Sequence, residues 1–262
     1  MPDFSVAKYR TLIANLLEEE YHFQTLSDYL TSPLPRSVIL RHDVDKRPGN
    51  SLEFAKLEHE LGVQSVYYFR AKPVSWDEKI IRKIHQMGHE IGYHYEDLTT
   101  CRGDFSKAYT EFRVNLEKLR ALAPVTTIAM HGSPTSRYDS RNLWEKYNYK
   151  SLGILGEPYF DVEFSNVLYL TDTGRRWDGT RSNVRDMVDN RLNLKLEENG
   201  VHIRTTNDLI RAAEGNQLPD VLMINTHPQR WHSTWAGWIS ELVSQNAKNV
   251  IKGSLKRFGY YD

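Results

Sequence analysis

Short runs of branched and aromatic residues recur along the chain, and most are followed by a segment whose apolar residues have helical spacing. The first run, at residues 37–45, contains three consecutive branched aliphatic residues, which is typical of a strand buried on both faces. Strands that alternate with helices predict a parallel sheet with crossover helices. Seven or eight such units predict an α/β fold, a closed or nearly closed (β/α) barrel. An open doubly wound sheet is the alternative, but no G-x-G-x-x-G loop follows the first strand.

The division into domains follows from where the first strand begins. We expect strands at residues 37–45, 63–70, 89–94, 126–131, 150–155, 166–170, 201–204 and 221–227. Residues 1–35 have apolar positions at helical spacing and predict an N-terminal helical extension packed on the outside of the barrel. Residues 36–262 would form one barrel domain, because α/β barrels often use ~200–250 residues as a single domain.

The composition excludes several classes of function. With 34 basic and 34 acidic residues and no basic stripe, the chain lacks the charge pattern of a protein that binds nucleic acid. A single cysteine, Cys101, excludes an internal disulfide framework and fits a reducing compartment. No apolar run is long enough to predict a membrane span, and the first residues do not resemble a signal peptide. We therefore expect a cytoplasmic protein.

The first expected strand ends in two carboxylates. Asp43 and Asp45 are two residues apart, so their side chains point to the same side of an extended chain. Carboxylates this close repel each other, and a shared proton, a metal ion or a neighbouring cation is needed to offset the repulsion. The structural alternative is that they cap the next helix or pair with Lys46 and Arg47.

Polar residues follow nearly every other expected strand as well. In a barrel, active sites lie at the carboxyl ends of the strands. These positions hold Arg70, His94 and Glu96, His131, Glu157 and Asp161, Asp172 and Arg175, and His227. Their repetition predicts a functional site at this end of the barrel.

The types of residue predict a transition-metal site. Carboxylate and imidazole together suit zinc, with Mn, Fe, Co or Ni as alternatives. A catalytic site of this kind uses about three protein ligands and keeps a position open for water. Asp45 and His94 are the first two candidates. The third ligand stays open between Glu96, Asp97 and His131.

These motifs resemble those of polysaccharide deacetylases of the NodB-homology type, carbohydrate esterase family 4, from about residue 38 to residue 227. The resemblance implies a distorted (β/α) barrel and a divalent metal. His42-Asp-Val-Asp45 resembles the motif that pairs an aspartate base with an aspartate ligand. Gly88-His-Glu-Ile-Gly-Tyr-His94 resembles the motif that carries two metal histidines four residues apart, but the second position holds Leu98.

Three further segments enter the comparison with this family. His131-Gly-Ser-Pro134 stands where the family has an arginine and prolines. Residues 171–178 stand where it has an aspartate and a tryptophan beside the site, and residues 222–227 resemble the motif that ends in a catalytic histidine, here His227. His-Tyr-Glu and Thr-His-Pro-Gln-Arg-Trp resemble members from O-antigen, lipopolysaccharide or capsule synthesis.

The first hypothesis is therefore a metal-dependent hydrolase that removes an acetyl-like N-acyl group from an amino sugar in surface-polysaccharide biosynthesis. Asp43 would act as the base and His227 as the acid. Tyr93, Trp177 and Trp231 are predicted to form walls for the sugar, and Arg70, Arg175 and Arg176 to hold an anionic group. The substrate would be a cytoplasmic amino sugar, nucleotide-linked or lipid-linked.

Two other classes remain open. A metal-dependent glycosyltransferase would use Asp-x-Asp to hold a nucleotide sugar, but the histidines at the strand ends then lack a role. A catalytically degraded barrel that only binds carbohydrate is favoured by Leu98 and opposed by the persistence of Asp43, Asp45, His94 and His227.

Overall fold

The computed structural model describes residues 2–133, 136–178, 188–239 and 241–242. Its centre is a parallel sheet in the order β5-β4-β3-β2-β7-β6. The strands are β2 (Ser37–Val44), β3 (Val66–Phe69), β4 (Glu90–Tyr95), β5 (Ile128–Met130), β6 (Leu168–Thr171) and β7 (Val221–Thr226). The bridge between Thr127 and Gly156 continues the sheet beyond β5.

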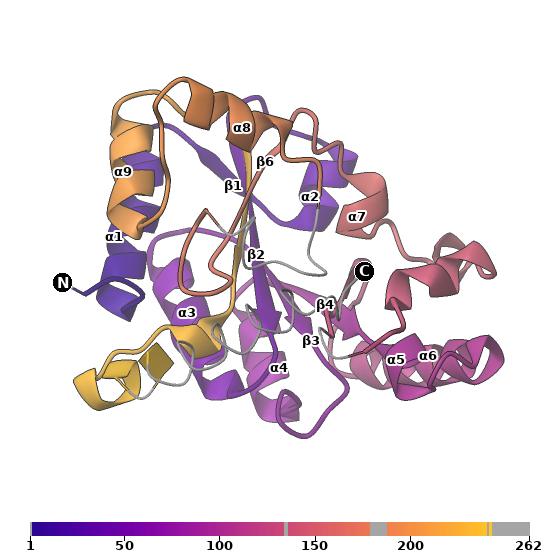
Figure 1. Ribbon diagram of the computed structural model, residues 1–262. Coiled ribbons are helices and arrows are strands. Elements are labelled where there is room, and N and C mark those ends of the chain that lie inside the picture. Colours follow the sequence, from indigo (N-terminus) through magenta and orange to yellow (C-terminus); the bar gives the residue numbers. More distant parts are fainter. Residues whose placement is uncertain (1, 134–135, 179–187, 240, 243–262) are drawn as a thin grey trace.

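Helices surround the curled sheet (Figure 1). They are α1 (Val6–Glu18), α2 (Leu26–Thr31), α3 (Pro48–Glu60), α4 (Glu78–Gln86), α5 (Asp97–Thr100), α6 (Phe105–Arg120), α7 (Pro158–Asp161), α8 (Arg191–Glu198) and α9 (Thr206–Glu214). Short 3-10 helices are η1 (Ser140–Glu145), η2 (Tyr149–Leu152) and η4 (Pro228–Arg230). This arrangement confirms the predicted distorted (β/α) barrel. None of the helices described is both long and apolar enough to cross a membrane.

The strands bury both faces, which explains why their apolar residues point to both sides of the sheet. Side chains of a strand alternate between its two faces. Ile39 belongs to a small inner cluster with Tyr68 and Met223, whereas its neighbours Val38 and Leu40 belong to the large cluster under the helices. Leu26 of α2 joins the inner cluster, so α2 closes the amino end of the barrel. The β2 residues that face the barrel interior become polar towards the carboxyl end of the strand.

The inner row of β4 contains a glycine at a close approach of two strands. A Cβ on Gly92 would lie 2.2 Å from Cε1 of Tyr68 and 3.1 Å from the carbonyl oxygen of Thr127. No side chain larger than a hydrogen atom fits between β3 and β5 at this level. Gly92 therefore leaves room for the Tyr68 ring inside the barrel, two residues before His94.

On the outer face, a buried carboxylate ties β2 and β3 to the helices. Glu58 of α3 lies with Oε1 2.8 Å from Nε2 of His42, and its Oε2 accepts hydrogen bonds from Tyr67 (2.8 Å) and Ser65 (2.7 Å). Tyr9 of α1 donates to the same carboxylate. Burial alone would raise the pKa of Glu58, but His42 outweighs it and the pKa is lowered to about 2.

Three parts of the fold differ from the prediction. The N-terminal segment contains a strand besides its helices: β1 (His22–Gln24) pairs with the first residues of β2, below the point where β3 begins. Residues 150–155 were expected as a strand, but η2 occupies the first half of this range, because Asn148 caps it and Gly153 ends it at φ 73°. Residues 201–204 do not form a strand either.

Candidate active site

Three side chains from three strand ends converge at the carboxyl end of the sheet. Asp45 follows β2, His94 lies near the end of β4 and His131 follows β5. Oδ1 of Asp45 is 3.6 Å from Nε2 of His94 and 3.3 Å from Nε2 of His131. Each of the three offers a ligand atom within 4.8 Å of the other two.

The donor set fits a divalent transition metal. Oδ1 of Asp45 is buried and accepts no hydrogen bond from the residues described, which is unusual for a buried carboxylate oxygen. Nδ1 of His94 is 2.9 Å from the carbonyl oxygen of Ala129, so Nε2 is the nitrogen left to face Asp45. Two imidazoles and one carboxylate oxygen match the ligands that zinc and related ions bind in proteins.

Of the three candidates for the remaining ligand, His131 lies in this cluster. Glu96 lies behind it: Arg70 donates to Oε1 of Glu96 at 2.9 and 2.7 Å, and Oε2 is 3.4 Å from Nδ1 of His131. Glu96 therefore orients His131 instead of joining the cluster. Asp97 is buried elsewhere, where it accepts hydrogen bonds from Tyr93.

The titration behaviour of the cluster follows from burial and charge. Burial lowers the pKa of His94 to about 4, although Asp43 acts in the opposite direction. Burial would also lower the pKa of His131, but Asp45 and Glu96 outweigh it and raise the pKa to about 9. A metal that binds His131 would therefore release a proton from the metal-free protein.

Asp43 lies beside the cluster and is held by a cation on its own strand. Arg41 donates to both oxygens of Asp43, from Nε at 2.8 Å and from Nη2 at 2.9 Å, and Asn225 of β7 donates to Oδ2 at 3.0 Å. Oδ2 of Asp43 is 3.7 Å from Nε2 of His94. Burial would raise the pKa of Asp43, but Arg41 and His94 hold it well below its ordinary value.

His227 lies on the other side of the cluster and is oriented by a buried aspartate. Its Nδ1 is 2.7 Å from Oδ1 of Asp172, and its backbone N–H donates to Oδ2 at 2.9 Å. Arg230 and Trp231 also donate to Asp172, at 2.6 and 2.7 Å. Burial would raise the pKa of Asp172, but Arg230 and His227 lower it. The free edge of the imidazole, Nε2, lies 3.9 Å from Oδ2 of Asp45.

Sequence reasoning missed two contacts at the centre of the site. Gln229 donates to Oδ2 of Asp45 at 3.1 Å and fixes that carboxylate from η4. The second is the bond from Arg41 to Asp43, which the sequence did signal, because an arginine directly follows the apolar run of residues 38–40. The residue Gln229 gave no such signal.

The structure contradicts the predicted aromatic walls. Tyr93, Trp177 and Trp231 are all buried, with 1% or less of their surface exposed. Tyr93 points to the outer face of β4 and packs on Phe112, as expected for a residue next to the inward-facing His94. Trp177 and Trp231 lie in the outer core, so none of the three rings is available to a sugar.

The predicted arginines have different surroundings. Arg70 lies at the site through its bonds to Glu96. Arg175 stacks over the rings of Phe4 and Trp238, at 5.2 and 5.1 Å from their centroids, and Nε of Arg176 donates to Asp178 at 2.6 Å. An anion-binding role for these arginines stays a prediction.

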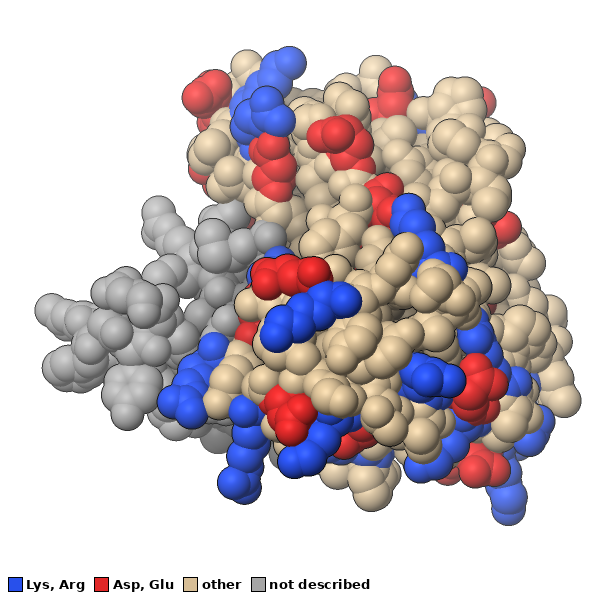
Figure 2. Space-filling model, turned by 90° about the vertical axis from the view of Figure 1, so that its right-hand side faces the viewer, with Lys and Arg blue, Asp and Glu red and all other residues tan. Residues whose placement is uncertain are grey.

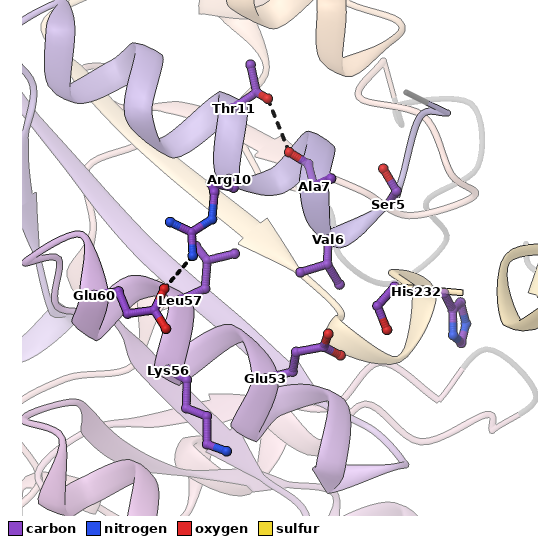
Figure 3. Close-up of a pocket in the computed structure, with 11 residues that line it drawn as sticks. Ser5, Val6, Ala7, Arg10, Thr11, Glu53, Lys56, Leu57, Glu60 and His232 are labelled. Atoms are coloured by element: carbon purple, nitrogen blue, oxygen red, sulfur yellow. Dashed lines mark hydrogen bonds and ion pairs between the residues drawn. The ribbon is translucent and has the colours of Figure 1, made fainter. Parts of the chain in front are cut away.

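A separate cleft lies away from this cluster. It has a volume of about 560 Å³ and runs between α1 and α3, where Arg10 pairs with Glu60 (Figure 3). Val6 and Glu53 face it from opposite sides. It shares no residue with the candidate active site.

Comparisons with known proteins found similarity in solved structures alone: no family model and no curated protein matches the chain. A CE4 esterase from Streptococcus mutans is 12% identical with a TM-score of 0.46, covering 91% of this chain and 90% of that chain. The peptidoglycan deacetylase PdaC from Bacillus subtilis is 13% identical with a TM-score of 0.43, covering 87% and 97%.

A third solved structure is described as a CE4 family pseudoenzyme from Bacillus anthracis. It is 10% identical with a TM-score of 0.44, and the match covers 83% of this chain but 63% of that chain, so this chain spans less than two thirds of its length. The chain is thus similar to carbohydrate esterase family 4 structures, the family that its motifs resemble. At these identities, the similarity concerns the fold and carries nothing about substrate or activity.

Proposed function

We propose that the chain is a metal-dependent hydrolase that removes an acetyl-like N-acyl group from an amino sugar. One observation carries the proposal: the cluster of three candidate ligands has a carboxylate on one side and a histidine–aspartate pair on the other. All of these groups lie at the carboxyl end of a parallel barrel, where such folds carry their active sites.

Asp45, His94 and His131 would hold the metal. A divalent ion held by them would polarise the acyl carbonyl and make a water molecule more acidic. The chain's own groups then move the protons. Asp43 accepts one from the attacking water as its oxygen adds to the carbonyl carbon, and His227 gives one from Nε2 to the amine nitrogen as the C–N bond breaks.

The surroundings of Asp43 and His227 support these roles. Arg41 and Asn225 keep the Asp43 carboxylate ionised and fix its direction, which favours orientation over basicity. Asp172 binds Nδ1 of His227, so Nε2 is the nitrogen that faces the substrate. The amine product and a carboxylic acid account for all atoms of the amide and the water.

We further propose that the amino sugar is a cytoplasmic precursor of a surface polysaccharide such as O-antigen, carried on a nucleotide or a lipid. The support is the resemblance of His-Tyr-Glu and Thr-His-Pro-Gln-Arg-Trp to proteins of that biosynthesis.

The test uses purified protein stripped with a chelator and reloaded with zinc, manganese, iron, cobalt or nickel. Release of acetate from a panel of N-acetylated amino sugars measures activity, and elemental analysis measures bound metal. We expect stoichiometric metal, its loss in His94→Ala, and its retention without turnover in Asp43→Asn. His59→Ala, at an exposed position of α3, is the matched control and should keep both.

Retained deacylase activity in Asp43→Asn would overturn the role of the base. A protein that takes up no metal under any loading would overturn the proposal and favour a carbohydrate-binding barrel. Metal-dependent binding of a nucleotide sugar without release of an acyl group would favour a glycosyltransferase.

A further inference from the structure

The two carboxylate oxygens of Asp45 have different surroundings. Oδ1 lies 3.6 Å from Nε2 of His94 and 3.3 Å from Nε2 of His131, and it accepts no hydrogen bond from the residues described. Oδ2 accepts a hydrogen bond from Nε2 of Gln229 at 3.1 Å and lies 3.9 Å from Nε2 of His227. One oxygen therefore faces the two imidazoles of the cluster, while the other already has a partner within the protein.

Gln229 is itself a buried polar side chain whose amide is only half satisfied. Just 2% of its surface is exposed. Its Nε2 donates to Asp45, whereas its Oε1 is buried and accepts no hydrogen bond from the part of the chain that the structure describes. A buried amide oxygen without a partner costs stability, and an apolar residue of the same shape would avoid that cost. The cost indicates that the amide serves the site and not the packing of the core.

The turn η4, which carries Gln229, is fixed by two other segments of the fold. Asn50 of α3 donates to the carbonyl oxygens of Pro228 at 3.3 Å and of Trp231 at 3.0 Å. Nε1 of Trp231 donates to the buried Asp172 at 2.7 Å. Figure 1 shows this turn, in gold, beside α3. The direction of the Gln229 amide is therefore set by the protein before any ligand binds.

Surface charge does not favour one kind of ion. The chain has 34 basic and 34 acidic residues, and Figure 2 shows side chains of both signs interspersed over one face of the molecule. Salt also screens the interactions of exposed charges over distance. The contacts within the cluster then decide how well a metal is held, and the bond from Gln229 is one of them.

The bond from Gln229 restricts how the carboxylate of Asp45 can bind a metal. A carboxylate binds a metal through one oxygen or through both. The bond favours the first mode, because it keeps Oδ1 towards the two imidazoles and gives Oδ2 a competing partner. Three donor atoms then come from the protein, and positions around the ion are left for water and substrate, as in catalytic zinc sites.

We propose that Gln229 is a positioning residue that makes Asp45 bind the metal through Oδ1 alone. The inference rests on the metal site of the proposed function, but it does not depend on which sugar or acyl group is the substrate. It assigns a role to a residue that touches neither the ion nor the reacting atoms.

The first measurement is zinc affinity, by competition with a chromogenic chelator on the full chain after its own metal has been stripped. Gln229→Met removes both polar ends of the amide and keeps a side chain of similar length. We expect this variant to bind zinc ~10–100-fold more weakly than wild type, which is the usual effect of losing a partner that orients a metal ligand.

The second measurement is the binding mode of Asp45, which a general loss of stability would not change. In crystal structures of the zinc-loaded proteins, we expect one oxygen of Asp45 on the ion in wild type and both oxygens in Gln229→Met. Infrared difference spectra between zinc-bound and metal-free protein should show the same change in solution, as a smaller separation between the two carboxylate stretching bands in the variant.

The matched control is Gln24→Met, because Gln24 is also a buried glutamine, with 5% of its surface exposed. Its amide bonds only to backbone atoms in the items of its own segment, donating to the carbonyl oxygen of Ser32 and accepting from the N–H of Leu34, both at 2.9 Å. We expect this variant to lower the stability of the fold and to leave the zinc affinity unchanged.

A second variant acts on the turn and leaves Gln229 in place. Asn50→Ala removes the two bonds to the carbonyl oxygens of η4. We expect it to weaken zinc binding less than Gln229→Met does, and to cause no further loss when the two substitutions are combined. A further loss in the double variant would contradict a route through Gln229.

The positioning role and the proposed function fail in different ways. Equal zinc affinity in wild type and Gln229→Met, or both oxygens of Asp45 on zinc in wild type, would overturn the positioning role, even if acetate is released. If zinc binds as expected but no N-acetylated sugar loses its acetyl group, the positioning role stands and the proposed function fails. A wild-type protein that takes up no zinc would overturn both.

Discussion

The buried carboxylate of Glu58 allows a stability prediction with a defined pH dependence. The substitution Glu58→Gln removes the negative charge that faces His42. It also changes the carboxylate oxygen that accepts hydrogen bonds from Tyr67 and Ser65. Weakening the acceptor of buried hydrogen-bond donors costs ~1–3 kcal/mol, and more where the acceptor was charged, because the donors stay desolvated. We expect Glu58→Gln to lose that much free energy of unfolding at pH 7.

The pKa of Glu58 gives an independent magnitude. It is lowered from 4.5 to about 2, which corresponds to ~3 kcal/mol of stability when the carboxylate is ionised. A carboxylate with a lowered pKa in the folded state stabilises the protein above its unfolded pKa, and this contribution is lost as the pH falls. The difference between wild type and Glu58→Gln should therefore narrow by ~1 kcal/mol between pH 7 and pH 3.5.

Urea unfolding at both pH values measures the two quantities. Glu60→Gln is the matched control, because Glu60 lies on the same helix, is 61% exposed and pairs with the exposed Arg10. Its effect should stay within ~0.5 kcal/mol. A loss below ~1 kcal/mol in Glu58→Gln, or a difference between wild type and variant that does not change with pH, would refute the reasoning.

The remaining predictions concern the barrel interior and the site. Gly92→Ala should destabilise the fold by ~1–3 kcal/mol in urea unfolding, because its Cβ would overlap the Tyr68 ring. Gly49→Ala is the control, because a Cβ there meets open space, and equal urea midpoints for the two variants would contradict the prediction. Asp172→Asn should lower turnover by ~10²–10⁴-fold and leave the bound metal unchanged, because His227 loses the partner that orients it. Turnover at the wild-type rate in this variant would exclude an orienting role for Asp172. Zinc should raise the Tm of the chelator-treated protein, and a Tm independent of zinc would count against the metal site.

The convergence of Asp45 and His94 could be anticipated because it depends on strand periodicity and on the edge at which parallel strands end. The choice of a third partner between Glu96, Asp97 and His131 could not, because it depends on contacts such as the one from Arg70, which follows β3, to Glu96. That contact is tertiary, and local sequence does not encode it.

Tyr93 was wrongly predicted for a reason that the sequence already contained. Adjacent residues of a strand point to opposite faces, so Tyr93 and His94 cannot both face the same site while β4 stays extended. Trp177 and Trp231 are different, because they lie outside strands and only the packing of distant segments shows that they are buried.

The main strands were predictable where apolar runs were long, as for β2 and β7. The strand β1 has three residues and no apolar alternation, and it forms because β3 leaves the start of β2 without a partner on that edge. At residues 150–155, the cap by Asn148 and the turn at Gly153 overrode the tendency to form a strand.

The pairing of β2 with β7 has a consequence for the order of events during synthesis. His42 and Thr226 are 184 positions apart, yet they are direct partners across these two strands. Before β7 has been synthesised, β2 has an unpaired edge that can pair with another nascent chain. A fragment that stops before Val221 should therefore aggregate, and the proposed reaction centre is incomplete until β7, which precedes His227, has paired with β2.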